Sequence, residues 1–174
     1  DAANFPTDRY ILEGIAERRG MRLVLIDNTS DGEVVSPNML AAYLDDDVAL
    51  VSLQVVQYRA GGRHDVRALT QMAREHGALR VWYAAHAVGS GELDLDANSV
   101  DLAVGCTYKY LNAGPGAPAW MYVNNSMQKE LRVPIQGWFA QADQFVMGPR
   151  FDRAPGIRGF QVASPSLMGI TCVM

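Results

Sequence analysis

The side chain best suited to covalent chemistry in this sequence is Lys109, which stands between Tyr108 and Tyr110. It follows an apolar run at 100–106, typical of a buried strand, and precedes a Gly-Pro-Gly turn at 114–116. An amine held at a strand end among aromatic rings loses its proton more readily than a hydrated one, and the neutral amine is a nucleophile. It can form a Schiff base with an aldehyde, and the usual biological aldehyde is pyridoxal 5′-phosphate (PLP). The spacing alone also permits a lysine that only extends its ammonium group into water.

Further polar and aromatic side chains are expected near Lys109 because of the strands that carry them. Tyr83 and His86 end one predicted strand, and Gln54 and Tyr58 lie near the end of another. Where helices connect parallel strands, the carboxyl ends of the strands stay open to build a site. The sequence therefore predicts that these residues and Lys109 converge at one edge of a sheet, as a cofactor site requires.

Short apolar runs alternate with amphipathic segments, which indicates an α/β fold with a mainly parallel sheet and flanking helices. The expected strands are 22–26, 48–56, 79–83, 100–106 and 117–123. The run at 48–56 is the longest and is expected to be a central strand, buried on both faces. The expected helices are 8–19, 37–44, 65–76 and 127–131, capped by Asp8, Ser36, Asp65 and Ser126. Polar turns are expected at 28–32 and 45–47, and turns also follow Pro134.

Composition and charge exclude several classes of protein. The chain has 174 residues, 49% of them hydrophobic, and a formal net charge of −4. This length is enough for one sizeable core, and the mild acidity argues against a nucleic-acid partner. No apolar run approaches the ~20 residues that span a bilayer, so no membrane partner is expected. Cys106 and Cys172 lie in apolar runs and are expected to be buried free thiols, which fits a reducing, cytoplasmic setting.

Several motifs resemble one family of enzymes. The run at 108–116, Tyr-Lys-Tyr-Leu-Asn-Ala-Gly-Pro-Gly, resembles the cofactor-lysine signature of kynureninases, PLP enzymes with the aminotransferase-type fold. Further segments match this family in the same order, at 4–8, 58–61, 86–89 and 137–139. The segment 155–160, followed by Ser164 and Pro165, resembles the part that opens the family's small domain. The resemblance therefore extends over nearly the whole chain.

The resemblance implies the central part of an aminotransferase-like PLP large domain at 1–135 and a crossover into a small domain at 136–174. Complete enzymes of this family are more than twice as long, so the chain is expected to be incomplete at both ends. Similar enzymes cleave L-kynurenine to anthranilate and L-alanine, or its 3-hydroxy form to 3-hydroxyanthranilate and alanine. The implied protein is a cytoplasmic homodimer that hydrolyses a carbon–carbon bond of an amino acid in tryptophan catabolism and NAD biosynthesis.

The same resemblance assigns roles to individual residues. Lys109 would form the Schiff base with PLP and move protons on the substrate, and Tyr108 would contact the phosphate and donate a proton. Phe5 would lie against the pyridine ring, and Asp8 would place a carboxylate near the ring nitrogen. Trp138 would reach the phosphate of the neighbouring subunit. The implied cofactor-binding residues are Phe5, Pro6, Thr7, Asp8, Gln54, Tyr83, His86, Tyr108, Lys109, Trp138 and Ser164.

The chain departs from the family pattern at positions that would face the cofactor. Tyr83 stands where similar enzymes have an aspartate, and a neutral phenol pairs poorly with a protonated pyridine nitrogen. Gln54 replaces a small hydroxyl residue, Ala140 and Gln141 replace Gly-His, and Ser164 replaces an asparagine. These departures leave open a related PLP enzyme with another amino-acid substrate. They also leave open a catalytically impaired pseudoenzyme that acts as a structural or regulatory partner.

Overall fold

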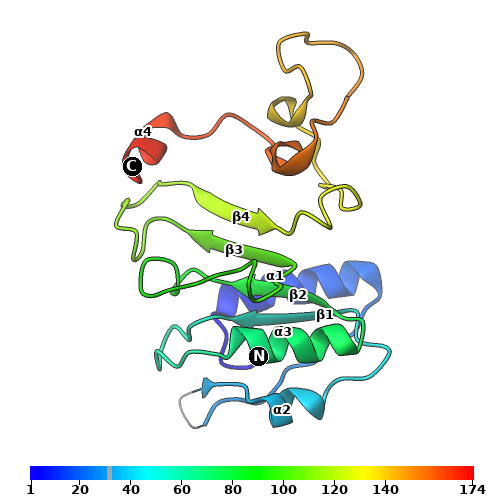
Figure 1. Cartoon of the computed structure of the whole chain (residues 1–174), viewed down its shortest axis with the longest axis vertical. Helices are drawn as coiled ribbons and strands as arrows, with labels where there is room; N and C mark the ends of the chain where they lie inside the picture. The colour runs from blue at the N-terminus through cyan, green and yellow to red at the C-terminus, as the bar shows by residue number, and fades with distance from the viewer. Residues whose placement is uncertain (31–32) are drawn as a thin grey trace.

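The computed structural model describes residues 1–30 and 33–174, and its centre is a four-stranded sheet in the order β1-β2-β3-β4 (Figure 1). The strands are β1 (Leu50–Gln54), β2 (Leu79–Tyr83), β3 (Leu102–Cys106) and β4 (Ala119–Val123). β1, β2 and β3 are parallel, and β4 runs antiparallel to β3. The prediction of a mainly parallel α/β sheet is therefore confirmed.

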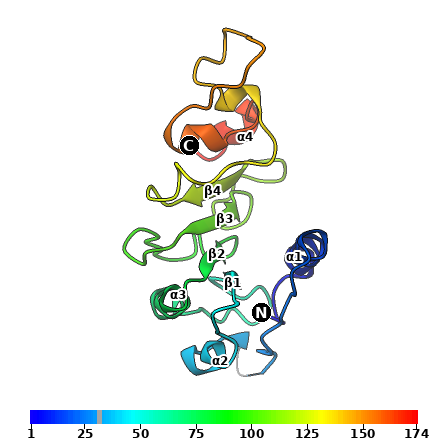
Figure 2. The ribbon, with the colours of Figure 1, turned by 90° about the vertical axis from the view of Figure 1, so that its right-hand side faces the viewer.

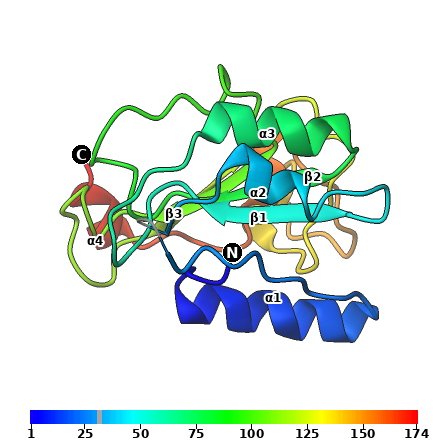
Figure 3. The same ribbon diagram turned by 90° about the horizontal axis from the view of Figure 1, so that it is seen from below.

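Helices α1 (Pro6–Arg19) and α3 (Val66–Glu75) lie on opposite faces of the sheet (Figures 2 and 3). α3 begins as predicted, because the Asp65 side chain accepts a hydrogen bond from the backbone N–H of Ala68 at 2.9 Å. Its buried face, which includes Leu69, packs with Leu53 and Trp82 into the main hydrophobic core. α1 buries none of its side chains against the described residues. The core therefore lies between the sheet and α3.

The predicted strand at 22–26 is wrong. These residues are extended but join no β-ladder within the described part of the chain, and Leu23, Val24 and Leu25 are exposed. The one buried member, Ile26, is held because its carbonyl accepts a hydrogen bond from the N–H of Ala2 at 2.8 Å. An apolar run becomes a strand only where a neighbouring strand satisfies its backbone groups.

The predicted central position of the 48–56 run is also wrong, since β1 stands at one end of the sheet order and Leu50 is exposed. Asp8 is not the cap of α1. The helix begins two residues earlier, at Pro6, whose ring presets the backbone angle of a first helical residue. Asp8 instead lies in the first turn of the helix, where its carboxylate favours the positive helix end. Of the turn expected at 28–32, residues 31–32 lie outside the described residues.

Helix α2 (Pro37–Ala41) begins as predicted, with the Ser36 side chain accepting a hydrogen bond from Met39. The helix predicted at 127–131 is replaced by turns. The carbonyls of Gln128 and Leu131 accept hydrogen bonds from the guanidinium of Arg153, at 3.1 and 2.8 Å, and not from a continuing helix. The N–H groups of Glu130 and Leu131 both donate to the carbonyl of Met127, so a single turn closes and does not extend into a helix.

The remaining segment contains only short elements, η2 (Trp138–Ala140), η3 (Gly156–Phe160) and α4 (Leu167–Thr171). Both cysteines are free, but Cys172 is exposed and Cys106 is only partly buried, so the prediction of two buried thiols is wrong. Among the described helices, none is both long and apolar enough to cross a membrane.

Candidate active site

Lys109 stands on a tight turn that is fixed to the end of β3. The Thr107 hydroxyl donates a hydrogen bond to the carbonyl of Pro118 at 2.7 Å, and the N–H of Ala113 donates back to the carbonyl of Thr107 at 3.1 Å. Within the turn, the N–H of Asn112 donates to the carbonyl of Lys109 at 2.9 Å, and Asn112 takes a left-handed φ of 58°. Hydrogen bonds on both sides of Lys109 therefore hold its backbone in place.

His86 is the polar partner of Lys109. The Lys109 Nζ lies 3.0 Å from His86 Nε2, which joins the turn after β3 to the loop after β2. Gly89 permits this approach, since a Cβ on it would lie 2.7 Å from the backbone oxygen of Tyr110, and its φ of 82° favours glycine. The His-Ala-Val-Gly motif thus has a physical reason: the glycine lets the two loops touch, and the histidine uses the contact.

The electrostatics of the site favour a neutral imidazole at His86. Burial, and then the positive charge of Lys109, lower the pKa of His86. A neutral imidazole nitrogen can accept the hydrogen bond that the ammonium group donates. Burial also raises the pKa of the Asp8 carboxyl, and the charge of Lys109 opposes that rise. Asp8, on the first turn of α1, therefore lies within electrostatic reach of the amine.

Aromatic rings partly surround the amine. The Lys109 Nζ lies 5.8 Å from the centre of the Phe5 ring and 5.6 Å from that of the Tyr108 ring. These distances suit an attraction between the cation and the ring faces. Tyr108 is half-exposed, and burial followed by the nearby Cys106 raises the pKa of its phenol. At neutral pH this phenol carries its proton and can donate it.

Tyr83 and Gln54 stand side by side at the ends of β2 and β1, in direct register. Burial, and then the charge of Asp8, raise the pKa of the half-buried Tyr83 phenol. Gln54 points into the protein and is only 2% exposed. Its side-chain N–H donates to the side-chain oxygen of Gln57 at 3.1 Å. Of this pair, Tyr83 lies within reach of the Asp8 charge, whereas Gln54 is occupied by an internal hydrogen bond.

Sequence reasoning missed the buried polar network behind Gln54. Gln57 donates from its side chain to the Asp1 carboxylate at 3.1 Å, and the Asn28 side chain donates to the carbonyl of Glu33. Gln57 and Asn28 are each 1% exposed. Polar residues inside or beside apolar runs could have indicated this network, because a buried side-chain amide needs hydrogen-bond partners.

The structure does not bring every predicted site residue to Lys109. Pro6 and Thr7 form the start of α1, and among the described residues no side-chain hydrogen bond joins them to Lys109, whose amine pairs with His86. Trp138 packs on Phe139 and Phe145, with ring centres 4.7 and 6.3 Å apart, and Ser164 is exposed. The roles of these four residues, like those of all the predicted site residues, stay predictions.

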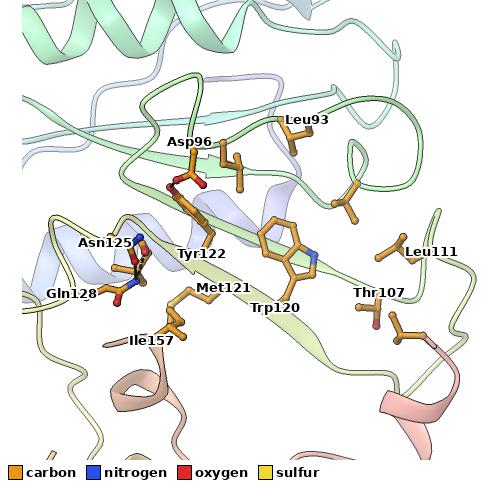
Figure 4. A pocket seen from close by; sticks show the side chains of 14 residues that line it. Leu93, Asp96, Thr107, Leu111, Trp120, Met121, Tyr122, Asn125, Gln128 and Ile157 are labelled. Carbon is orange, nitrogen blue, oxygen red and sulfur yellow. Dashed lines mark hydrogen bonds between the residues drawn. The ribbon is translucent and has the colours of Figure 1, made fainter. Parts of the chain in front are cut away.

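A pocket of about 670 Å³ opens beside β4 (Figure 4). It is lined mainly by apolar side chains, among them Leu93, Leu111, Trp120, Met121 and Ile157. At its polar end the Tyr122 hydroxyl donates to the Asp96 carboxylate. None of the predicted site residues lines this pocket, so it is distinct from the group around Lys109. Among residues 1–30 and 33–174, no cluster of three or more potential ligands could hold a metal ion.

The chemistry available at Lys109 is that of an amine with a hydrogen-bonding imidazole, a nearby carboxylate and flat aromatic walls. Such an arrangement can hold a carbonyl compound covalently and move protons beside it.

Comparison with known proteins agrees with this chemistry. Residues 4–145 match the family model described as Aminotransferase class-V. Kynureninases from Pseudomonas fluorescens and Burkholderia mallei are each 38% identical over 175 residues, which covers 99% of this chain and 40% of each relative. The chain thus spans about two fifths of the length of the curated relatives it matches.

Solved structures share the fold. A cystine C–S lyase in complex with cysteine persulfide superposes with a TM-score of 0.81 at 20% identity, covering 98% of this chain and 46% of that one. A cysteine desulfurase from Thermococcus onnurineus gives a TM-score of 0.76 at 22% identity, covering 95% and 40%. An alanine–glyoxylate aminotransferase from Nostoc sp. gives 0.62 at 27% identity, covering 77% and 35%.

Proposed function

Because the chain belongs to the aminotransferase class-V family, we propose that it acts as a PLP-dependent hydrolase of the kynureninase kind. Its substrate would be L-kynurenine or 3-hydroxykynurenine, and its products an anthranilate and L-alanine, a step of tryptophan catabolism. The observation that carries this proposal is the 3.0 Å contact between Lys109 and His86 on the loops after β3 and β2. Similarity to curated kynureninases over 99% of the chain supports the choice of substrate.

The residues around Lys109 fit PLP, the cofactor of this family. PLP supplies an aldehyde that reacts with amines and a ring that withdraws electrons from the substrate. Lys109 would hold the cofactor through its amine, Phe5 would lie against the cofactor ring, and Asp8 would stand near the ring nitrogen. One residue fits less well. Tyr83 is neutral at pH 7, where similar enzymes place an aspartate.

The chain's own groups then divide the proton transfers between them. We assign to Lys109 the removal of the proton from the substrate α-carbon. His86 would accept a hydrogen bond from the resulting ammonium group and hold it in position. Tyr108, whose raised pKa keeps the phenol protonated, would donate a proton as water adds to the γ-carbonyl. The carbon–carbon bond between the β and γ positions would then break, so that the γ-carbon leaves as the carboxyl group of the anthranilate and the β-carbon takes up a proton to become the methyl group of alanine.

A homodimer is part of the proposal. Trp138 lies in a segment with several exposed large apolar side chains, including Phe145, Val146 and Met147, which are 64–74% exposed. An exposed apolar patch of this kind suits a protein interface, and aromatic residues dominate interface energetics. Trp138 would then face the cofactor phosphate of the partner. Light scattering at micromolar concentration should give the mass of a dimer, and a monomer would contradict this part of the proposal.

Tyr83 specifically favours a second candidate, a related PLP enzyme with a different amino-acid substrate. A neutral phenol stabilises the protonated pyridine nitrogen of the cofactor less than a carboxylate would. The cofactor ring then withdraws electrons from the substrate less strongly. Chemistry that depends less on this withdrawal would be affected less. Changes in the visible absorption of the PLP-loaded protein, measured with a panel of amino acids, would identify such a substrate.

Product analysis tests the leading proposal. The purified protein is incubated with saturating PLP and L-kynurenine or 3-hydroxykynurenine, and the anthranilate and alanine formed are quantified. Hydrolysis of the carbon–carbon bond predicts equal amounts of the two products. Alanine without anthranilate, or no product from a folded protein that binds PLP, would contradict the proposal. If the PLP-bound protein forms no product from either kynurenine but its absorption changes with another amino acid, the result would favour a related PLP enzyme with a different substrate.

A further inference from the structure

We propose that Tyr58 is a positioning residue of the cofactor site, whose ring holds Phe5 and His86 in place around the Lys109 amine. Tyr58 stands in the loop between β1 and α3 and has no role in the reaction outlined above. The inference rests on the cofactor site of the proposed function but not on its substrate.

Four side chains form a closed series of contacts. The Tyr58 ring meets the Phe5 ring edge-on, with centres 5.3 Å apart and an angle of 88° between the ring planes. Its centre is also 6.5 Å from that of the His86 ring. His86 in turn contacts Lys109 at 3.0 Å, and Lys109 lies 5.8 Å from the Phe5 ring centre. Tyr58 therefore touches both groups that flank the amine.

The backbone of Phe5 is held, since its N–H donates to the Asn4 side chain at 2.7 Å, but the Phe5 side chain is less firmly fixed. Phe5 precedes α1, and that helix buries none of its side chains in the described part of the molecule. The Phe5 side chain is itself 42% exposed. Because no packed helix face fixes this end of α1, the edge-on contact with Tyr58 has a larger share in setting where the Phe5 ring lies. Such aromatic pairs contribute beyond the area they bury.

Tyr58 itself is firmly held. Its neighbour Gln57 is 1% exposed, donates from its backbone N–H to the carbonyl of Gly62 at 2.8 Å and accepts from the N–H of Gly61 at 3.0 Å. Gly61 closes this turn with a φ of 70°, a conformation that favours glycine. The Gln57 side chain also donates to Asp1, in the segment that leads to Phe5. One short loop thus ties the tyrosine to the same segment as the phenylalanine.

Arg59 also contacts the Tyr58 ring. Its guanidinium carbon lies 5.6 Å from the centre of the Tyr58 ring, and the same side chain pairs with Glu33. A ring that is held by these contacts can transmit its position to Phe5 and His86. Losing the ring should therefore loosen both walls of the cofactor site while leaving Lys109 able to react.

The test compares PLP binding and the visible circular dichroism of bound PLP in the whole protein, without substrate. Tyr58→Leu should weaken PLP binding about threefold to tenfold, the range that one aromatic pair contributes. It should also lower the dichroism at saturating PLP, because a less confined cofactor has a less fixed orientation. Tyr58→Phe keeps the ring and should restore both values to within about twofold of wild type. Tyr43→Leu is the matched control, since Tyr43 follows α2 and has no aromatic contact in the described residues, and it should change neither value.

Unchanged binding and dichroism in Tyr58→Leu would overturn the proposal, as would a Tyr58→Phe protein as impaired as Tyr58→Leu. If Tyr58→Leu does not fold, Tyr58→Met fills a similar volume without a ring and should show the same two losses. The readouts do not involve kynurenine. A Tyr58 effect without kynurenine cleavage would therefore refute the proposed function alone, and cleavage without a Tyr58 effect would refute this inference alone.

Discussion

The strand ends of the sheet and the segment that follows β4 contribute to the candidate site in different ways. From the strand ends, His86 and Lys109 meet at 3.0 Å, and Tyr83 lies close enough to Asp8 for its pKa to respond. From the later segment, Trp138 packs against the nearby rings of Phe139 and Phe145, and Ser164 is exposed. A parallel sheet brings its strand ends together whatever else is present. A loop segment reaches a site only through further contacts, which the proposed partner subunit would supply.

The Arg153 side chain joins several parts of the later segment. Arg153 donates to the carbonyls of Gln128, Leu131 and Gly159, and its guanidinium carbon lies 4.4 Å from the centre of the Phe160 ring. These contacts join the turns after β4 to η3. They bury Phe160, which is 8% exposed, but leave other large apolar side chains such as Phe145, Val146 and Met147 exposed.

The largest expected effect on activity comes from Lys109, on the turn that follows β3. Lys109→Ala should lower turnover of L-kynurenine by about 10²–10⁴-fold, because the variant lacks both the amine that holds the cofactor and the proton-transferring group. The sequence contains one other lysine, Lys129, which is exposed after β4 and provides the matched control. Steady-state assays should show Lys129→Ala at wild-type turnover. Equal losses in both variants would mean that the site is elsewhere.

The two regions should also differ in stability. Leu69 is 1% exposed between α3 and the sheet, so Leu69→Ala leaves a cavity and should lower the free energy of unfolding by about 2–5 kcal/mol. Phe145 is 74% exposed, and Phe145→Ala should change the free energy of unfolding of the monomer by less than about 0.5 kcal/mol. Urea denaturation at low protein concentration measures both. A comparable loss in Phe145→Ala would show that the later segment is packed more tightly than the structure indicates.

The packed region should lose stability in mild acid. Burial lowers the pKa of His64 to about 4, and its Nε2 accepts a hydrogen bond from the N–H of Val35 at 2.9 Å, which only the neutral ring can do. Below the ordinary histidine pKa of 6.5, His64 binds a proton in the unfolded chain but stays neutral in the folded chain down to about pH 4. The free energy of unfolding should therefore fall by up to about 3 kcal/mol between pH 6.5 and 4. Urea denaturation of His64→Gln across this pH range should show a smaller fall in the free energy of unfolding. If the fall is the same as in wild type, other groups cause it.

The smallest effect concerns Tyr83. Tyr83→Asp would place a carboxylate beside the cofactor ring, as in similar enzymes, and should raise turnover of L-kynurenine about tenfold, equivalent to ~1.4 kcal/mol of the barrier. Desolvation opposes this gain, because a buried aspartate close to Asp8 can share one proton with it. Tyr83→Asn is the neutral control and should give no increase in the same assay with saturating PLP. A folded, PLP-loaded Tyr83→Asp protein without increased turnover would mean that Tyr83 does not limit catalysis.

Much of the part of the site at the ends of β1, β2 and β3 could be predicted from sequence, because local sequence patterns determine where these strands lie. The run at 79–83 is a strand as predicted, and its parallel partners bring His86 and Lys109 to one edge. Predictions that depended on distant partners were wrong. The run at 22–26 lacks a ladder, and the turns at 127–131 are held by Arg153, which lies more than 20 residues later in the sequence. The role of Gln57 was missed for the same reason, since its partner Asp1 is 56 residues away in sequence.

The most direct test of the account is to locate the cofactor on the chain. The PLP-loaded protein is reduced with borohydride, digested, and its peptides are identified by mass spectrometry. With two lysines in the sequence, the result is a choice between Lys109 and Lys129. The account predicts a pyridoxyl group on Lys109 alone, at one per chain, with loss of the yellow colour. A modified Lys129 with Lys109 untouched, or no adduct on a folded protein, would contradict it.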